Sequence, residues 1–263
     1  MTKALGIDIG SLTTKAVIVG DDGVLASSTA PTIDTAESSA RATAQQALSQ
    51  LGLDFDSGLH VVSTGVGGKS VSFSQPKAIT TCLARGGNHL VPSARMIIDI
   101  GAESITIVKV NERGRVSDWG NQDKCAAGTG IFIQQMARLM HLSLEEMAAL
   151  SLEATARADI SSTCAVFAES EVISHVHRVP PTPKQDIAAG IYFSMAHRIL
   201  GLCKRIGIQK DVAVTGGVAL NTGLVRILGE ELGDRILMPQ MPQTVAALGA
   251  AIIARENAHK GEE

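Results

Sequence analysis

Two stretches of the chain carry an apolar run that ends in the same four letters. Residues 6–19 (GIDIGSLTTKAVIV) and 97–110 (IIDIGAESITIVKV) both place Ile-Asp-Ile-Gly after one apolar strand and before a second, partly alternating one. A strand, a glycine-containing turn and a returning strand predict a β-hairpin, because glycine tolerates backbone angles that other residues avoid. The repetition predicts two halves of like fold.

Strand-like and helix-like runs alternate along the rest of the chain. Strands are predicted at 23–30, 59–65 and 212–217. Helices are predicted at 36–52, 75–90, 184–207, 221–233 and 243–258. This interleaving predicts an α/β protein. We place the boundary near residue 92, which gives domains 1–92 and 93–263, with the last helix able to pack back on the first half.

The amino-acid composition argues against several classes of function. Aromatic residues make up 3% of the 263 residues, too few for the stacking platforms that bind single-stranded nucleic acid. A formal net charge of −3 offers no basic surface for duplex DNA or an anionic membrane. Because the sequence shows neither a secretory signal nor a membrane-spanning run, we expect a cytoplasmic enzyme or enzyme subunit without nucleic-acid or membrane partners.

The turn of the first hairpin carries the groups that a magnesium nucleotide requires. Asp8, at the end of its strand, can hold Mg²⁺ or its waters, and Lys15 adds a positive charge nearby. Donors to phosphate oxygens are expected from the turn residues Gly10, Ser11, Leu12, Thr13 and Thr14. Phosphoryl transfer depends mainly on positioning and charge neutralisation, and such a turn supplies both.

The second hairpin repeats this arrangement, so two loops are expected to clamp one triphosphate. We assign Asp8, Asp99 and Glu103 as candidate catalytic residues. A third segment, 214–223 (VTGGVALNTG), is predicted to form a strand, a Gly-Gly turn and the start of a helix. The Gly-Gly turn would let the backbone approach a nucleoside, with the helix N–H groups behind it. The predicted nucleotide-binding set is completed by Gly101, Ala102, Ser104, Gly216, Gly217, Val218, Asn221 and Gln243.

One further glycine-rich segment resembles a phosphate loop without matching it. Residues 63–70 (STGVGGKS) end in Gly-Lys-Ser as a Walker loop does, but the first glycine of that pattern is replaced by Ser63. We interpret the segment as a connection with a solvated Lys69.

Two cysteines, Cys125 and Cys164, each stand where a helix is predicted to begin, the second with Ser161 to Thr163 as candidate caps. Cys82 and Cys203 lie inside apolar helical patterns and are expected in the core. The sequence contains no Cys-x-x-Cys pair, so a zinc knuckle or a thioredoxin-type motif within one chain is not supported. Two cysteines alone would make half a metal site.

Together these segments resemble a known family. The chain is similar to the acetate and sugar kinase, heat-shock-protein-70 and actin superfamily. Within it, the chain is similar to activator ATPases of 2-hydroxyacyl-CoA dehydratases and the related benzoyl-CoA reductase subunits. The resemblance lies in IDIGSLTTK (7–15), TCLARG (81–86), DIGAES (99–104), DKCAAGTG (123–130), ISSTCAVFAESEVIS (160–174), GGVALNTG (216–223) and PQTVAALGAA (242–251).

The resemblance implies an actin-like ATPase fold, with two duplicated ribonuclease-H-like halves and an ATP cleft between them. It implies ATP/ADP, Mg²⁺ and one [4Fe–4S] cluster per homodimer, held by Cys125 and Cys164 of each subunit. The expected partners are ferredoxin or flavodoxin as electron source and an iron–sulfur dehydratase or reductase as acceptor. The alternatives are an ATPase subunit of a benzoyl-CoA reductase-type complex, a sugar or acyl kinase, and a chaperone-like nucleotide switch without redox chemistry.

The sequence departs from the activator pattern in the second hairpin. Activators typically read DIGGQDSK where this chain has Glu103-Ser104 in place of a Gln-Asp pair. The departure affects the details of the second phosphate loop and leaves both cysteine segments unchanged.

Overall fold

The computed structural model describes residues 2–55, 58–123 and 128–261. The strands are β1 (Ala4–Ile9), β2 (Thr13–Gly20), β3 (Gly23–Pro31), β4 (His60–Thr64), β5 (Gln75–Pro76), β6 (Met96–Ile100), β7 (Ile105–Val110), β8 (Val116–Gln122), β9 (Val212–Thr215) and β10 (Ile236–Leu237). The α-helices are α1 (Ala36–Ser49), α2 (Ile79–Leu90), α3 (Gly130–Leu139), α4 (Leu144–Leu152), α5 (Ala165–His177), α6 (Lys184–Ile206), α7 (Thr222–Leu232) and α8 (Val245–Gly261). The 3₁₀-helices are η1 (Gly68–Ser70), η2 (Gly217–Leu220) and η3 (Pro242–Thr244).

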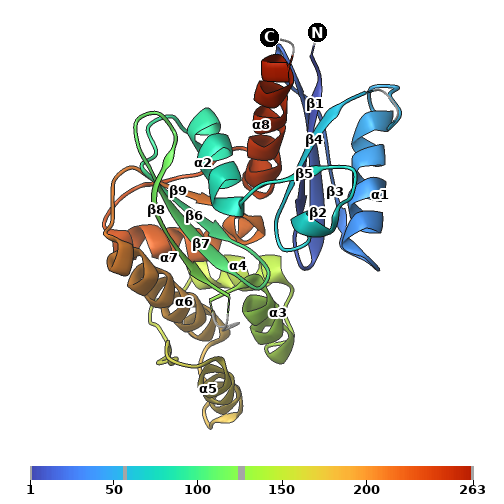
Figure 1. Cartoon of the computed structure of the whole chain (residues 1–263). Coiled ribbons are helices and arrows are strands. Elements are labelled where there is room, and N and C mark those ends of the chain that lie inside the picture. The colour runs from blue at the N-terminus through green and yellow to red at the C-terminus, as the bar shows by residue number, and fades with distance from the viewer. Residues whose placement is uncertain (1, 56–57, 124–127, 262–263) are drawn as a thin grey trace. The chain divides into compact units, whose positions relative to one another are not determined.

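These strands form two five-stranded sheets with helices around them, which confirms the predicted α/β class (Figure 1). The first sheet has the order β3-β2-β1-β4-β5, and the second has the order β10-β9-β6-β7-β8. Among the described helices, none is both long and apolar enough to cross a membrane.

β1 is a buried strand inside the first sheet, antiparallel to β2 and parallel to β4. Successive side chains of a strand point to opposite faces. Leu5, Ile7 and Ile9 therefore pack with α1, whereas Ala4 packs with α8 on the other face (Figure 1). A Cβ on Gly6 would meet the α8 backbone, so this glycine lets α8 lie directly against β1.

The second sheet holds β6 between β9 and β7. Its apolar residues include Ile98, Ile100 and Ile105, all fully buried. The long helix α6 packs against α4 and α7, and α3 contacts α4 and α5. The helices that carry or follow the cysteine motifs therefore belong to one packed group.

Both predicted hairpins are confirmed as β1–β2 and β6–β7. Two predicted helix starts are wrong. The helix predicted from residue 75 begins at Ile79, because residues 75–76 pair with β4 as strand β5. The helix predicted to begin at Cys125 begins at Gly130, because Gly128 has a positive φ of 101° that a right-handed helix excludes.

Contacts divide the chain into two compact units. The first comprises Met1–Ile97, Val108–Asp118 and Pro239–Glu263, and the second comprises Ile98–Ile107 and Trp119–Met238. The helix α8 belongs to the first unit and packs against β1, β2, β4 and α2. The domain boundary near residue 92 stays a prediction.

Candidate functional site

The turn of the first hairpin is held by its own backbone and by one threonine. The Gly10 amide donates to the Thr13 carbonyl at 3.1 Å, closing a tight turn. The Thr32 hydroxyl donates to the Gly10 carbonyl at 2.8 Å and lies 2.9 Å from the hydroxyl of buried Thr14. Thr14 therefore braces the turn, while Leu12 is 40% exposed and Ser11 half-buried at its tip.

Asp8 stands at the end of β1, just before this turn, and is buried. Its Oδ2 lies 3.6 Å from Nζ of Lys15, which also donates to the Thr13 carbonyl at 3.3 Å. Burial raises the pKa of Asp8, and the Lys15 charge offsets part of that rise. A divalent cation beside this carboxylate would favour its ionised form.

The segment interpreted as a solvated connection lies against the end of β1. The Gly67 amide donates to the Ile9 carbonyl at 3.1 Å, and Thr64 lies opposite Asp8 in the β1–β4 register. Gly65 has a φ of 84°. Lys69 is exposed as predicted, but the glycines of this segment belong to the surroundings of Asp8.

The second hairpin turn repeats the first. The Gly101 amide donates to the Ser104 carbonyl at 2.9 Å. The Thr215 hydroxyl of β9 donates to Oδ1 of Asp99 at 2.8 Å. Glu103 is exposed at the tip of the turn, and its catalytic role stays a prediction.

The third predicted loop begins at the end of β9. Gly216 has a φ of 89° and a backbone close to Ile100, and Gly217 is exposed. Asn221 caps α7 by accepting from the Leu224 amide at 3.0 Å and donates to the Tyr192 hydroxyl at 2.8 Å. Its side chain therefore holds the loop in shape.

The helix α3 starts directly against the second hairpin turn. The Gly130 amide donates to the Gly101 carbonyl at 3.0 Å, and the Ile131 amide donates to the Ala102 carbonyl at 2.9 Å. A Cβ on Gly130 would lie 3.2 Å from Cγ2 of Val218. The helix that follows the first cysteine motif is thus bonded to a predicted phosphate loop of the same unit.

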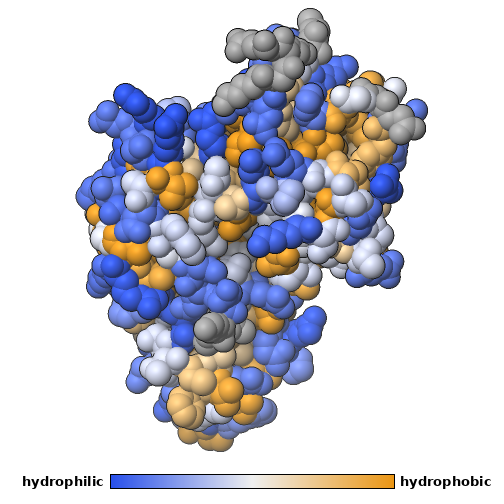
Figure 2. Space-filling model, in the orientation of Figure 1, coloured by the Kyte–Doolittle hydropathy of each residue, from blue (hydrophilic) through white to orange (hydrophobic). Residues whose placement is uncertain are grey.

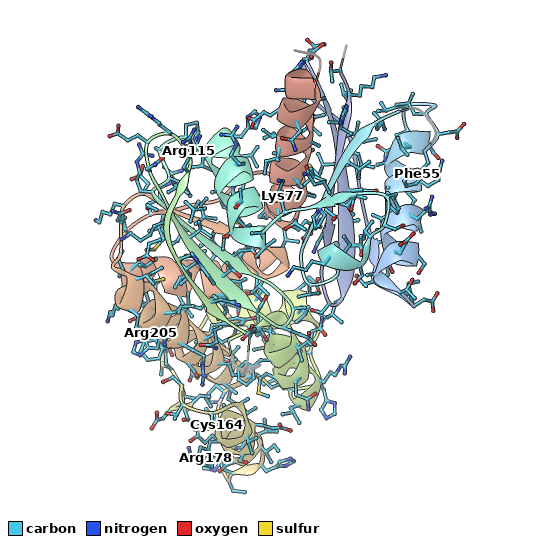
Figure 3. The ribbon with its side chains drawn as sticks, in the orientation of Figure 1. Phe55, Lys77, Arg115, Cys164, Arg178 and Arg205 are labelled. Atoms are coloured by element: carbon cyan, nitrogen blue, oxygen red, sulfur yellow. The ribbon has the colours of Figure 1, made fainter. Side chains whose placement is uncertain are left out.

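The cysteines fall into two kinds. Cys82 and Cys203 are fully buried, and burial raises the pKa of each thiol to about 12, which confirms them as core residues. Cys164 is half-buried and is the N-cap residue of α5, without a side-chain capping bond (Figure 3). Cys125 lies outside the described residues.

The start of α5 is held by neighbours other than the predicted caps. The expectation that Ser161 to Thr163 cap the helix is wrong, because the N-cap position is Cys164 itself. The Ser161 amide instead donates to the carboxylate of Glu171 at 2.5 Å. Arg198 of α6 donates to the Ser162 carbonyl, and a Cβ on Gly128 would lie 3.1 Å from its Cδ. Arg198 therefore lies against one residue of each cysteine motif.

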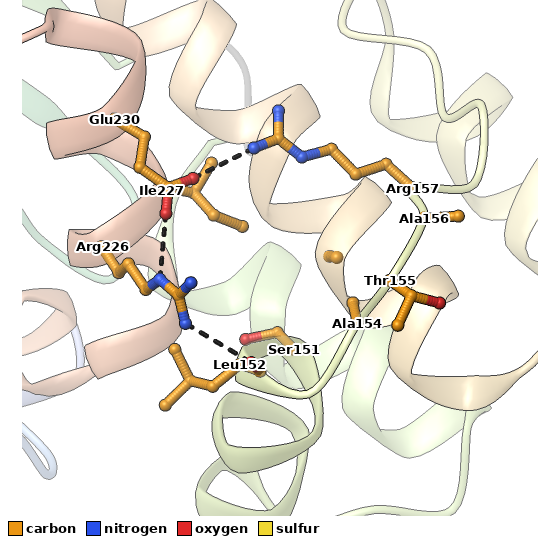
Figure 4. Close-up of a pocket in the computed structure, with 10 residues that line it drawn as sticks. Ser151, Leu152, Ala154, Thr155, Ala156, Arg157, Arg226, Ile227 and Glu230 are labelled. Atoms are coloured by element: carbon orange, nitrogen blue, oxygen red, sulfur yellow. Dashed lines mark hydrogen bonds and ion pairs between the residues drawn. The ribbon is translucent and has the colours of Figure 1, made fainter.

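The remaining predicted residue, Gln243, lies half-buried in η3, ahead of α8 in the first unit. A pocket of about 240 Å³ lies in the second unit, and its lining residues, which include Arg157, Arg226 and Glu230, are not among the predicted nucleotide-binding residues. Both arginines are paired with the Glu230 carboxylate (Figure 4). Because its charges are paired internally and it contains none of the predicted nucleotide residues, this pocket is not a candidate nucleotide site.

Sequence relatives extend over nearly the whole chain. The activator of lactoyl-CoA dehydratase from Anaerotignum propionicum is 40% identical over 97% of this chain and 98% of its own length. The 2-hydroxyisocaproyl-CoA dehydratase activator from Clostridioides difficile is 37% identical over 98% and 97%. A benzoyl-CoA reductase subunit from Thauera aromatica is 33% identical over 96% and 93%.

Solved structures agree with this grouping. The Clostridium difficile activator with bound ADPNP has a TM-score of 0.92 at 37% identity, covering 99% of this chain and 97% of its own. Component A of the (R)-2-hydroxyglutaryl-CoA dehydratase from Acidaminococcus fermentans has a TM-score of 0.93 at 36% identity, covering 98% and 100%. These likenesses confirm the predicted actin-like ATPase fold. The BadF/BadG/BcrA/BcrD ATPase family model matches residues 5–254. The chain therefore belongs to this family and is an ATP-hydrolysing enzyme.

Proposed function

We propose that this ATPase passes a low-potential electron from a [4Fe–4S] cluster to a partner iron–sulfur enzyme of the 2-hydroxyacyl-CoA dehydratase type. The observation that carries the proposal is the placement of Cys164. Its thiol lies at a helix N-terminus and is partly accessible, whereas the described Cys82 and Cys203 are sealed in the core. Free backbone N–H groups at a helix N-terminus favour a thiolate and the anionic sulfur of a cluster.

The donor set fits a cluster that two subunits share. A [4Fe–4S] cluster takes four thiolates, and Cys125 with Cys164 supplies two from each chain. Cys125 lies outside the described residues, so its part rests on the sequence motif. Such a cluster would supply a one-electron carrier.

Exposed apolar side chains on α5 support a second copy as the partner of this surface. Val166 and Phe167, in the first turn after Cys164, are 66% and 62% exposed, and Ile173 is exposed further along the helix. Figure 2 shows hydrophobic surface gathered at α5. Apolar residues grouped in this way are typical of protein interfaces, and a two-fold dimer would bring two such helices together.

The glycine turns supply the ATP chemistry of this proposal. Asp8 and Asp99 bind Mg²⁺ or its waters, and the amides and hydroxyls around Gly10 and Gly101 bind phosphate oxygens. Ferredoxin or flavodoxin would reduce the cluster again after it has passed an electron to the acceptor. The α3 amides bonded to Gly101 and Ala102 support a link between nucleotide state and the cysteine segment.

Iron and acid-labile sulfide per chain, measured with the native mass on anaerobically purified protein, test the proposal. We expect about two irons per chain in a homodimer, since one cluster serves two subunits. Cys164→Ser should lose the iron and keep nucleotide binding, whereas the matched control Cys203→Ser should keep the iron. Absence of iron after attempted reconstitution would exclude the proposal.

The same measurement separates the second candidate. A benzoyl-CoA reductase-type ATPase subunit would purify in a stable hetero-oligomer, as the likeness to the Thauera aromatica protein suggests. A separable homodimer that contains iron favours the activator.

A further inference from the structure

Asp8 and Asp99 occupy matching positions in two copies of one local arrangement. Each is the second-to-last residue of its strand, β1 or β6, and is followed by Ile-Gly. In each copy the glycine amide closes the hairpin turn, Gly10 onto Thr13 at 3.1 Å and Gly101 onto Ser104 at 2.9 Å.

The neighbouring strand repeats as well. β4 ends in Thr64 and is followed by Gly65, and β9 ends in Thr215 and is followed by Gly216. The two glycines have φ of 84° and 89°, and a Cβ on either would meet the carbonyl oxygen of the isoleucine after the aspartate. In both copies a 3₁₀ turn follows the glycine. The Gly68 amide donates to the Gly65 carbonyl, and the Ala219 amide donates to the Gly216 carbonyl, each at 3.2 Å. The segment 63–70 is thus the first unit's counterpart of the predicted nucleoside loop 214–223.

The two copies differ in what holds the aspartate. In the second unit the Thr215 hydroxyl donates to Asp99. In the first unit the Thr64 hydroxyl donates to the Lys77 carbonyl at 3.0 Å. Thr64 therefore does not hold the Asp8 carboxylate in the way that Thr215 holds that of Asp99. The orientation of the Asp8 carboxylate depends instead on Lys15 and on the space beside the carboxylate.

That space exists because residue 65 is glycine. A Cβ on Gly65 would lie 2.5 Å from Oδ1 of Asp8, closer than real Cβ contacts. We propose that Gly65 is a positioning residue, which keeps the Asp8 carboxylate in the orientation that binds the nucleotide's Mg²⁺. The inference rests on the role of Asp8 in the proposed function. Since Mg²⁺ accepts little departure from octahedral oxygen geometry, a displaced carboxylate binds it poorly.

The test is the Mg²⁺ dependence of ATP hydrolysis by the full-length protein. Gly65→Ala should raise the Mg²⁺ concentration for half-maximal hydrolysis about tenfold, because coordination tolerates only small displacements. Binding of the nucleotide without Mg²⁺ should stay within about twofold, which a general loss of structure would not allow.

Two glycines provide matched controls. Gly52 and Gly233 each have a φ of 64° with open space around them, so Gly52→Ala and Gly233→Ala carry the backbone strain alone. Both control variants should keep the wild-type Mg²⁺ requirement.

Asp8→Asn separates the two hypotheses. If Asp8→Asn leaves Mg-ATP hydrolysis unchanged, the assignment of Asp8 fails and the inference fails with it. If Asp8→Asn abolishes hydrolysis while Gly65→Ala keeps the wild-type Mg²⁺ requirement, or shifts it no more than the controls do, the inference alone is overturned. Should Gly65→Ala fail to fold, Gly65→Asn, whose side chain tolerates positive φ better, takes its place with the same expected shift.

Discussion

At Asp8, burial and charge pairing act in opposite directions on one carboxylate. Desolvation raises its pKa, and the Lys15 ammonium at 3.6 Å lowers it. Both side chains are only 12% exposed, so the protein keeps a nearly dry ion pair at the end of a strand. Replacing such a pair with groups of similar shape is often neutral or stabilising.

We therefore expect Asp8→Asn combined with Lys15→Met to raise the free energy of unfolding of the metal-free protein at neutral pH by about 1 kcal/mol. The same double variant should lose Mg-ATP hydrolysis. Urea unfolding and an ATPase assay check the two halves. A double variant that is destabilised by a similar amount would show that the pair is kept for stability instead of metal binding.

The raised pKa of Asp8 predicts how the difference in unfolding free energy between the wild type and the double variant depends on pH. A carboxyl whose pKa is higher in the folded state binds its proton more tightly there, so folding gains stability at low pH. This contribution is lost as the pH rises above 3.8 and through the folded-state pKa of Asp8. The stability of the wild type relative to the double variant should therefore fall over this window, and a curve that rises there would contradict the assigned direction.

Among the elements, α6 positions the start of α5 through Arg198. Its guanidinium donates to the Ser162 carbonyl, two residues before Cys164. Arg198→Met removes a charge-assisted hydrogen bond, so amide exchange in residues 161–166 should become about tenfold faster or more. Arg205→Met, an exposed position on the same helix, is the matched control.

That exchange experiment needs no cluster, so it tests the positioning alone. Release of iron to a chelator from the loaded protein should become faster in Arg198→Met and stay unchanged in Arg205→Met. Unchanged exchange in both variants would mean that Glu171, which accepts from Ser161, holds this segment without Arg198.

Element by element, the sequence was informative where a pattern was long or repeated. The two Ile-Asp-Ile-Gly hairpins and helices such as α1 and α6 were predicted near their observed bounds. The short α4 was missed, although Ser143 and Glu146 form a readable capping box at its start. β8 was missed because its composition, VSDWGNQ, is mostly polar.

The candidate site was predictable only in part, for a physical reason. A sequence pattern shows which residues end a strand, but strand pairing decides which loops meet. The Thr-Gly pairs at 64–65 and 215–216 end similar apolar strands, and comparing them would have linked residues 63–70 to Asp8. The start of α3 depends on the positive φ of Gly128, which glycine permits but does not require.

On the scale of the whole molecule, the first unit is assembled from both ends of the chain. The helix α8 follows the entire second unit in sequence and yet packs against β1 and α2. The first unit therefore cannot complete its core until the C-terminal helix is in place. Its helix contacts are unusually close, because Gly86 of α2 and Gly249 of α8 bring the two backbones together.

This close packing makes Gly249 a sensitive point for the whole fold. A Cβ on Gly249 would meet the Cys82 carbonyl and lie 2.9 Å from the Gly86 amide, so Gly249→Ala must push α8 away from α2. We expect it to lower the free energy of unfolding by about 1–3 kcal/mol, as overpacking of a core does. The matched control is Gly201→Ala on α6, which has open space and should gain about 0.5–1 kcal/mol from helix propensity. Urea unfolding compares the two variants, and equal stability would mean that α8 shifts at no cost and that the close approach of these helices is incidental to the fold.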